Sequence, residues 1–540
     1  MVTTHLADSA RARRADPMWR VGFVTACAVV FGLYLLDPPN VPDLAAQTAR
    51  AEAAKDGAYL WWTGWFGGLT LPSYSVGSPW VMAHVGVGLS AALSGLVACA
   101  AAPILFEGTR RPRAGAAVFA LGVVLNVLTG RVTFALGLAA AVLALVFLKR
   151  RQPWGTGAAA VAACLFSPLA GLWLGLIAVT VAIVDPSRRR AALIVSALLV
   201  GSAGTLAVLF INAGTMPFPW WHVALALVAA GIGAAVCPSR EIRVGAAVFA
   251  GAIVAFALVP SAVGTNMMRL VWLSAGPAAV ATAVLPALPK LALRRAGIAV
   301  LGVGALSWPV TDLSLQLAQA ASPQASRSYY ASLVEQLQQR SGVDGPAALG
   351  QRVEIVDPAS HWSAAYVAPT VPIARGWDRQ ADRAANPFFY DGTLSAANYR
   401  AFLSDLAVRW VALPTEGSLD YAAKAEADLI RSGLGYLTPI WADESWQLFQ
   451  VEQHSPLLRG ATLLEIDASD ITFRAAQAGP VHLQIRWSPL LTLTAAESGE
   501  SVGCVVARDE WTTIEVPAAG TYTLVSRLSL PTGADGSDCN

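Results

Sequence analysis

The chain has 540 residues, of which 55% are hydrophobic and only 13% are charged. Since an ordinary soluble protein carries roughly 25% charged residues, these values exclude a single soluble domain. A net charge of +2 provides no basic surface for nucleic acid.

The charges are distributed unevenly along the chain. Residues 1–311 contain nine of the 35 acids and 22 of the 37 bases, whereas the later residues contain the other 26 acids. The first part therefore has a net charge of about +13 and the second part a net charge of about −11. This division predicts a transmembrane domain at 1–311 followed by polar domains.

Eleven apolar segments in the first part are candidates for membrane-spanning helices, which need about 20 apolar residues. They are residues 20–36, 79–106, 114–130, 132–148, 156–168, 169–184, 191–212, 222–237, 244–259, 269–288 and 296–311. The run 156–184 is too long for one span, and a hairpin that turns near Pro168 keeps the basic clusters that flank the run on one side of the membrane. The sequence thus predicts a polytopic α-helical membrane protein.

The basic residues between these segments alternate with nearly uncharged connections. Six basic clusters place 18 cations on one side, and only Arg50, Lys55, Arg131 and Arg269 fall on the other. Because loops rich in Lys and Arg stay in the cytoplasm, the N-terminus is expected there. Everything after residue 311 is then extracytoplasmic, and the protein is expected in the plasma membrane.

Residues 37–78 form the longest outer connection of this part. Asp43–Lys55 follows a proline and contains good helix formers, so it predicts a short helix along the membrane surface. Asp43, Gln47 and Arg50 share one face of that helix. The aromatic run from Tyr59 to Phe66 is typical of the membrane interface.

Acidic residues on the predicted outer side of the membrane part all lie in this loop. They are Asp37, Asp43, Glu52 and Asp56, and no predicted span contains an acid. A base at the outer face must therefore come from this loop or from the later domains. Ion-coupled transporters usually keep carboxylates at mid-membrane depth, so this distribution disfavours a transporter. Asp43 has an alternative role as the N-cap of its helix.

Three motifs carry a family resemblance: WFGGLTLPSYS (65–75), VGTNMMRL (263–270) and ARGWDRQ (374–380). These motifs make the chain resemble a group of actinobacterial multi-pass membrane proteins. The first outer loop with Asp43, the many-helix core and the outside C-terminal part make it resemble, more broadly, the GT-C superfamily of membrane glycosyltransferases. The resemblance implies a polyprenyl-phosphate-linked sugar donor and a cell-envelope (cell wall) glycan or lipid acceptor. It also implies an inverting transfer with Asp43 as the base.

The sequence departs from the superfamily at one point. Many members have paired acids in this loop, whereas Asp43 has no acidic neighbour, and Glu52 and Asp56 point away from it on the helix. No His and Cys cluster has metal-site spacing either, so no ligand cluster supports a divalent metal. We therefore assign no cofactor with certainty: a divalent metal is possible, but no ligand cluster supports it.

A polyprenyl-phosphate sugar needs cations near its phosphate and planar or aromatic groups near its sugar. Arg50 and Arg269 are the expected cations, although Arg269 could instead extend to the interface from the start of a span. The other candidates for substrate binding are Gln47, Tyr74, Asn266, His361, Trp362, Arg375 and Trp377. The alternative for the last four is a loop packed on its own domain by an Arg–Asp pair.

The polar part divides near residue 458. Helical and strand patterns alternate over 312–457 and predict an extracytoplasmic α/β domain, whereas short strands with Gly and Pro turns over 458–540 predict an antiparallel β-sandwich. The sandwich is either a glycan-binding module or a spacer. Cys504 and Cys539 are either a disulfide or two free thiols.

Three functions are compatible with these features. A membrane glycosyltransferase accounts for the acidic outer loop, the outer cations and the sugar-suited polar part together. The alternatives are a transporter or flippase for a lipid-linked envelope component and a non-catalytic envelope assembly protein. Membrane lipids are partners in each case.

Overall fold

The computed structural model describes residues 17–70, 75–210, 214–236, 239–282, 290–343 and 350–527. The chain forms two compact units. The helical unit consists of Met1–Pro39, Val85–Val208 and Thr215–Gln316, and the polar unit consists of Asn40–His84, Leu209–Gly214 and Leu317–Asn540. The first outer loop therefore folds with the C-terminal part of the chain.

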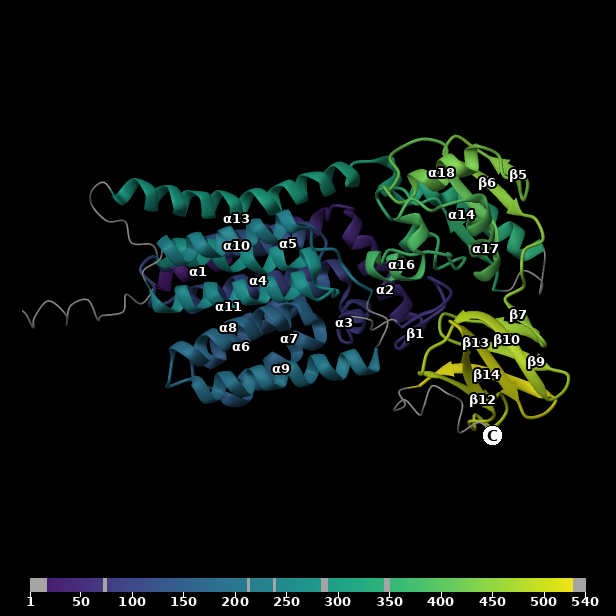
Figure 1. Cartoon of the computed structure of the whole chain (residues 1–540), viewed down its shortest axis with the longest axis horizontal. Helices are drawn as coiled ribbons and strands as arrows, with labels where there is room; N and C mark the ends of the chain where they lie inside the picture. Colours follow the sequence, from purple (N-terminus) through teal and green to yellow (C-terminus); the bar gives the residue numbers. More distant parts are fainter. Residues whose placement is uncertain are drawn as a thin grey trace, which may run out of the picture. The chain divides into compact units, whose positions relative to one another are not determined.

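The helices of the helical unit lie side by side (Figure 1). They are α1 (Pro17–Leu36), α4 (Val87–Leu105), α5 (Pro112–Leu128), α6 (Val132–Lys149), α7 (Pro153–Phe166), α8 (Pro168–Val184), α9 (Arg189–Leu209), α10 (Trp220–Val236), α11 (Arg240–Leu258), α12 (Met267–Thr282) and α13 (Lys290–Ala320). Each predicted apolar segment thus contains a helix within its described residues, and the segment 79–106 is split at Gly86 into α3 (Ser78–Val85) and α4.

Several of these helices have the dimensions of membrane spans. In the described part of the chain, α1, α4, α6, α9 and α11 are long and apolar enough to cross a membrane, and α5, α7, α8 and α10 are shorter apolar helices. The chain is therefore a membrane protein with a helical N-terminal region, as its composition predicts.

Local sequence explains the helix ends and the close packing. The predicted turn near Pro168 is confirmed, because Ser167 ends α7 and its side chain accepts the N–H of Ala170 in the first turn of α8. Small residues let neighbouring helices approach: a Cβ on Gly137 of α6 would lie 2.8 Å from the Cβ atoms of Ser167 and Ala170. α13 continues past residue 311 and contains Asp312.

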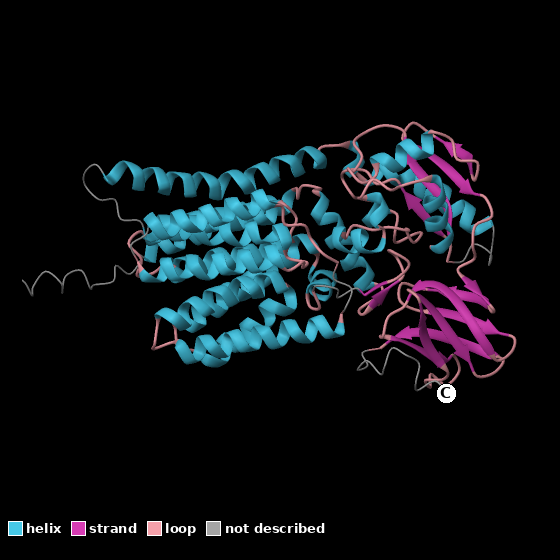
Figure 2. Cartoon of the chain, viewed as in Figure 1, coloured by secondary structure: helices cyan, strands magenta, loops and turns pink. Residues whose placement is uncertain are grey.

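All strands of the described residues belong to the polar unit, where they form separate sheets (Figure 2). The α/β part contains α14 (Arg327–Val343), β3 (Arg352–Ile355), α15 (Ser363–Tyr366), α16 (Arg379–Ala385), α17 (Ala396–Asp405), β4 (Val408–Pro414), α18 (Lys424–Arg431), β5 (Leu437–Ala442) and β6 (Trp446–Val451). Its sheet has the order β3-β4-β6-β5, in which β3 and β4 are parallel and the other pairs are antiparallel.

The C-terminal part has the predicted β-sandwich form. One sheet has the order β12-β13-β10-β7 and the other the order β11-β14-β9-β8, and all neighbours are antiparallel. The strands are β7 (Leu458–Arg459), β8 (Thr462–Ile466), β9 (Ile471–Ala475), β10 (Gly479–Arg486), β11 (Leu491–Ala495), β12 (Cys504–Arg508), β13 (Trp511–Val516) and β14 (Gly520–Ser526). Cys504 is disulfide-bonded, and Cys539 lies outside the described residues.

The aromatic residues of the first outer loop correct a prediction. The loop forms the hairpin β1 (Trp61–Trp62) and β2 (Leu69–Thr70), which turns through positive φ angles at Gly67 and Gly68. Trp61 is 1% exposed and belongs to the sandwich core, and Trp65 is fully buried. These rings pack against protein, so their assignment to the membrane interface was wrong.

Candidate functional site

Asp43 lies on α2 (Pro42–Lys55), the helix of the first outer loop. Pro42 opens the helix because a proline has no N–H to leave unpaired in the first turn, and Val41 is the N-cap residue. Asp43 is half-buried in the first turn, where the helix dipole stabilises a carboxylate. The alternative that Asp43 is the N-cap is therefore wrong.

Arg50 lies two turns after Asp43 on the same face of the helix and forms a buried ion pair within the polar unit. Its guanidinium donates to the Asp378 carboxylate at 2.9 Å, and the two side chains are 1% and 9% exposed. Asp378 also caps α16 by accepting the N–H of Ala381. A phosphate could reach Arg50 only if Asp378 released it.

Further contacts join the first outer loop to the segment 361–377. The indole N–H of Trp362 donates to the Asn40 carbonyl at 2.8 Å, and the N–H of Ile373 donates to the Gly64 carbonyl at 2.9 Å. Gly376 lies against the ring of Trp65, which a Cβ on Gly376 would meet at 2.3 Å. Trp65 and Gly376, which belong to two of the three motifs, thus pack on each other.

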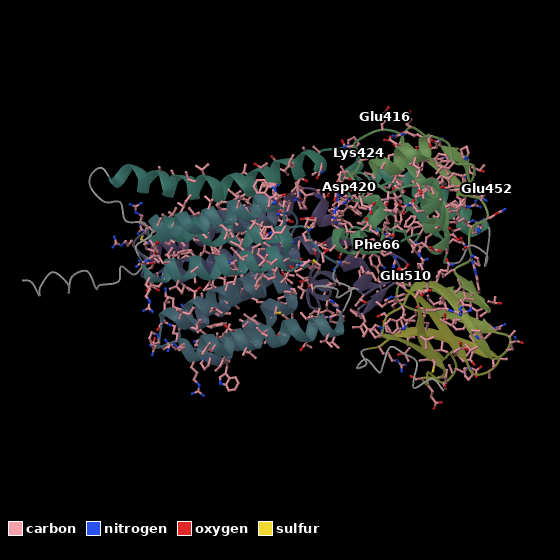
Figure 3. The ribbon with its side chains drawn as sticks, in the orientation of Figure 1. Phe66, Glu416, Asp420, Lys424, Glu452 and Glu510 are labelled. Atoms are coloured by element: carbon pink, nitrogen blue, oxygen red, sulfur yellow. The ribbon has the colours of Figure 1, made fainter. Side chains whose placement is uncertain are left out.

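The imidazole of His361 stacks on Trp377, with ring centroids 3.4 Å apart and an angle of 8° between the planes. The ring also bonds to Asp357, and its Nε2 lies 3.8 Å from Asp420. Arg379 donates two hydrogen bonds of 2.7 Å to Asp420, which Figure 3 labels. Burial raises the pKa of Asp420, but the Arg379 hydrogen bonds and the nearby charges lower it to about 2.

Arg375 lies in a second buried cluster. It donates to Glu354 at 2.8 Å and to Glu426 at 2.6 Å, and both carboxylates are fully buried. Tyr399 donates to Glu426 at 2.8 Å. Burial raises the pKa of Glu354 well above its usual range. This cluster holds β3, α17 and α18 together.

The candidate sugar-binding residues therefore lie close together but are largely covered. Trp362 is 3% exposed and Arg375 is 8% exposed. The cavity beside Arg375, Trp377 and Arg379 measures about 20 Å³, which is room for about one water molecule. The Arg379–Asp420 pair matches the alternative of a loop packed on its own domain.

A much larger polar cavity lies within the helical unit. Its volume is about 230 Å³. The lining comes mainly from the later residues of α5, from Arg131 just before α6, from α12 and the residues just before it, and from the later residues of α13. Its polar side chains are Asn126, Thr129, Arg131, Thr265, Asn266, Arg269, Trp272 and Asp312.

The charged side chains of this cavity come from three different segments. Arg131, which precedes α6, forms an ion pair of 2.5 Å with Asp312 of α13. Arg269 of α12 donates to the side-chain oxygen of Asn266 at 3.2 Å and lies over the Phe134 ring. Two guanidinium groups and one carboxylate therefore share the cavity.

Two other polar side chains of the cavity lack a partner among the described residues. Asn126 is 6% exposed, and neither its amide nitrogen nor its amide oxygen makes a hydrogen bond. The indole nitrogen of Trp272, which is 7% exposed, has none either. A buried polar group without a partner costs about 1–3 kcal/mol, so these groups are suited to a polar ligand.

The structure thus brings together Asn266 and Arg269 of the candidate residues. Gln47 is buried on α2 near Arg50, and Tyr74 lies outside the described residues. Sequence reasoning missed Asn126, Trp272 and Asp312 in the cavity. Arg131 was recognised only as one of four outer cations, and Asp312 lies one residue beyond the last predicted span.

No group of three or more His, Cys, Asp or Glu side chains in the described ranges could hold a metal ion.

Comparison with known proteins returns similarities of two kinds. A family model described as a domain of unknown function, DUF8823, matches residues 459–540, which is the β-sandwich. No curated protein sequence matches the chain.

Among solved structures, the chain is similar to the arabinofuranosyltransferase AftD from Mycobacteria, with 11% identity and a TM-score of 0.44 over 97% of this chain and 58% of that one. It is also similar to ArnT from Cupriavidus metallidurans bound to undecaprenyl phosphate, with 14% identity and a TM-score of 0.43 over 81% of this chain and 98% of that one. At this level of similarity the comparison assigns no substrate and no catalytic residue to this chain.

Proposed function

We propose that this protein is a membrane glycosyltransferase that moves a sugar from a polyprenyl-phosphate donor to an extracytoplasmic glycan or lipid acceptor. The observation that supports it best is the cavity of the helical unit. It combines Arg269 and Arg131 with the buried, unpartnered amide of Asn126. Guanidinium groups suit a phosphate, and an amide with free donors and acceptors suits a sugar hydroxyl.

The place of the cavity along its helices agrees with this function. α5 and α13 begin next to basic clusters, and the cavity is lined by their later residues, whereas it is lined by Arg131 just before α6 and by α12 from its first turn to Pro277. Under the positive-inside rule, all four segments then line the extracytoplasmic end. A lipid-linked sugar presents its phosphate at that level.

In the proposed reaction, an acceptor hydroxyl attacks the anomeric carbon of the donor sugar while the bond from that carbon to the phosphate oxygen breaks. The family resemblance assigns the role of general base, which takes the hydroxyl proton, to Asp43 of the polar unit. The departing phosphate keeps the bonding electrons and gains negative charge, which Arg269 stabilises. Attack opposite the leaving phosphate inverts the configuration of the sugar.

A transporter or flippase for a lipid-linked envelope component is the second candidate. The observation that favours it is the Arg131–Asp312 pair inside the helical unit, because paired charges among apolar helices also mark transport pathways. A non-catalytic assembly protein would need neither Asp43 nor the cavity charges.

The test is an in vitro assay of the purified full-length protein with radiolabelled polyprenyl-phosphate sugars and envelope acceptors. We expect Asp43→Asn to lower transfer by at least about 100-fold, in the range of general-base effects. Glu52→Gln is the matched control, since Glu52 lies on the same helix in an exposed pair with Lys55. Arg269→Ala should lose transfer and donor binding together.

Each outcome separates the candidates. Transfer that survives Asp43→Asn at the wild-type rate removes Asp43 as the base. Donor movement across proteoliposomes without any transfer would support the transporter instead.

A further inference from the structure

The cavity of the helical unit contains one acid between two bases, and the proposed function gives that acid no role. Asp312 pairs with Arg131 at 2.5 Å and lines the same cavity as Arg269. The charged residues that line it in the described ranges therefore have a net charge of +1. A site built only to hold phosphate as tightly as possible would have no carboxylate there.

We propose that Asp312 lowers the preference of this cavity for a phosphomonoester dianion over a phosphodiester monoanion. The inference rests on the proposed function. A polyprenyl-phosphate sugar is a phosphodiester with one negative charge, and transfer of the sugar leaves a lipid phosphomonoester. The monoester carries a charge of about −1.5 to −2 at neutral pH.

This effect on the relative affinity for the two ligands follows from how electrostatic energy scales with charge. Arg131 and Arg269 attract a dianion twice as strongly as a monoanion, so two arginines alone would hold the product more tightly than the donor. Asp312 repels the dianion twice as strongly as the monoanion and so opposes this bias. A net charge of +1 in place of +2 therefore reduces the electrostatic advantage of the dianion over the monoanion.

The geometry supports direct competition between Asp312 and the ligand. The Asp312 carboxylate accepts from a guanidinium nitrogen of Arg131, a group that a phosphate oxygen would also use. Asp312 is 28% exposed and Arg131 is 20% exposed, so neither group is sealed within protein. The unpartnered groups of Asn126 and Trp272 are neutral and bind either ligand without distinguishing its charge.

The test compares two probes on the purified full-length protein in detergent at low salt and pH 8. The probes are farnesyl phosphate, a monoester, and methyl farnesyl phosphate, a diester. We expect the ratio of monoester affinity to diester affinity to be lower in wild type than in Asp312→Asn. Asp312→Asn should raise the affinity for both probes. The gain in affinity for the monoester should be about the square of the gain for the diester, so that a gain of about threefold for the diester goes with about tenfold for the monoester.

Two control variants isolate the charge of Asp312. Asp312→Glu keeps the carboxylate and should keep the wild-type ratio of the two affinities. Asp185→Asn removes a carboxylate at the end of α8 that does not line the cavity, and it should change neither affinity.

Equal gains for both probes, or no gain in Asp312→Asn, would overturn the role of Asp312. A ratio of monoester affinity to diester affinity that is as high in Asp312→Glu as in Asp312→Asn would also overturn it, and Asp312→Ser provides the same comparison if Asp312→Asn does not fold. If Arg269→Ala abolishes binding of both probes while Asp312→Asn changes nothing, only the role of Asp312 fails. If wild type binds neither probe, the proposed function fails with it.

Discussion

Arg50 and Asp378 lie 328 residues apart in the sequence and form a hydrogen-bonded ion pair of 2.9 Å that is almost completely buried. The pair fixes α2 against the segment that begins α16. Since Asp43 lies on α2, the position of the proposed base depends on a contact with the C-terminal part of the chain. The first outer loop is therefore better regarded as a part of the polar unit than as a connection between helices.

Removing one partner of this pair should destabilise the polar unit. We expect Arg50→Met to lower the free energy of unfolding by about 3 kcal/mol, because it leaves the Asp378 carboxylate buried without its counter-ion. Transfer activity should fall with it, since α2 loses its anchor. Thermal unfolding of the detergent-purified protein measures the first effect and the transfer assay the second.

The matched control for Arg50 is Lys55→Met on the same helix. Lys55 pairs with Glu52 at 3.5 Å, but the two side chains are 64% and 47% exposed. An exposed pair contributes at most about 1 kcal/mol, so the control should unfold near the wild-type temperature. Equal losses in the two variants would contradict the anchoring role of Arg50.

Gly376 provides a second test of how the first outer loop is held. Its φ is not positive, so alanine there adds no backbone strain, but the added Cβ would lie 2.3 Å from the ring of Trp65. We expect Gly376→Ala to destabilise the protein by about 1–3 kcal/mol through overpacking. Limited proteolysis should then cleave the first outer loop sooner than in wild type.

Gly435→Ala is the control for Gly376, because no atom lies within 4 Å of its added Cβ. It should leave stability unchanged or raise it slightly, since alanine restricts the unfolded chain. The steric explanation fails if both glycine variants behave alike.

The sequence predicts the secondary structure of this chain well, because long apolar runs and alternating strands carry strong local signals. Every predicted membrane segment contains a helix within its described residues, and the α/β part and the β-sandwich both occur. The burial of Trp61 and Trp65 could not be predicted in this way. An aromatic run beside a membrane span has the same composition whether it faces lipid headgroups or packs in a protein core.

The candidate site was predicted only in part, and the reason lies in long-range pairing. Asn266 and Arg269 were found because they share one short motif. Asp312 was missed because a hydropathy pattern ends a span at the first acid, although α13 continues to Ala320. Its partner Arg131 is 181 positions earlier in the chain, and no local pattern links the two residues.

The Arg379–Asp420 pair gives the polar unit a defined acid sensitivity. The folded-state pKa of Asp420 is about 2, below its usual value near 4. Because the folded protein binds the proton less tightly than the unfolded chain, the stabilisation is complete above about pH 4 and is lost as the pH falls toward about 2. Its size is about 2 kcal/mol.

We therefore expect Asp420→Asn to lower the stability by about 2 kcal/mol at pH 7 and by progressively less as the pH falls from about 4 to about 2. Chemical unfolding of the purified protein at a series of pH values measures the difference. Asp428→Asn serves as the control, because the Asp428 side chain is 80% exposed and lies 3.7 Å from Arg431. A constant difference between wild type and Asp420→Asn over this pH range would contradict the assignment.

Asn126 should show opposite effects on stability and on binding. Its amide is buried without a partner among the described residues, so replacing it by leucine removes an unsatisfied polar group and should raise the free energy of unfolding by about 1–3 kcal/mol. The same change removes a donor and an acceptor from the cavity, so binding of the methyl farnesyl phosphate probe should weaken about tenfold, the loss expected from one hydrogen bond. Thermal unfolding and equilibrium binding measure the two effects on one protein sample.

The comparison for Asn126 is Asn386, a buried asparagine whose amide is satisfied. Its side-chain nitrogen donates to Asp382 at 2.8 Å, and its exposed fraction is 2%. Asn386→Leu should therefore destabilise the protein, because it leaves a buried carboxylate without that donor. If Asn126→Leu raises the stability and weakens probe binding while Asn386→Leu lowers the stability, the amide of Asn126 serves a ligand and the amide of Asn386 serves the fold. If Asn126→Leu loses stability as Asn386→Leu does, the amide of Asn126 serves the fold and not a ligand.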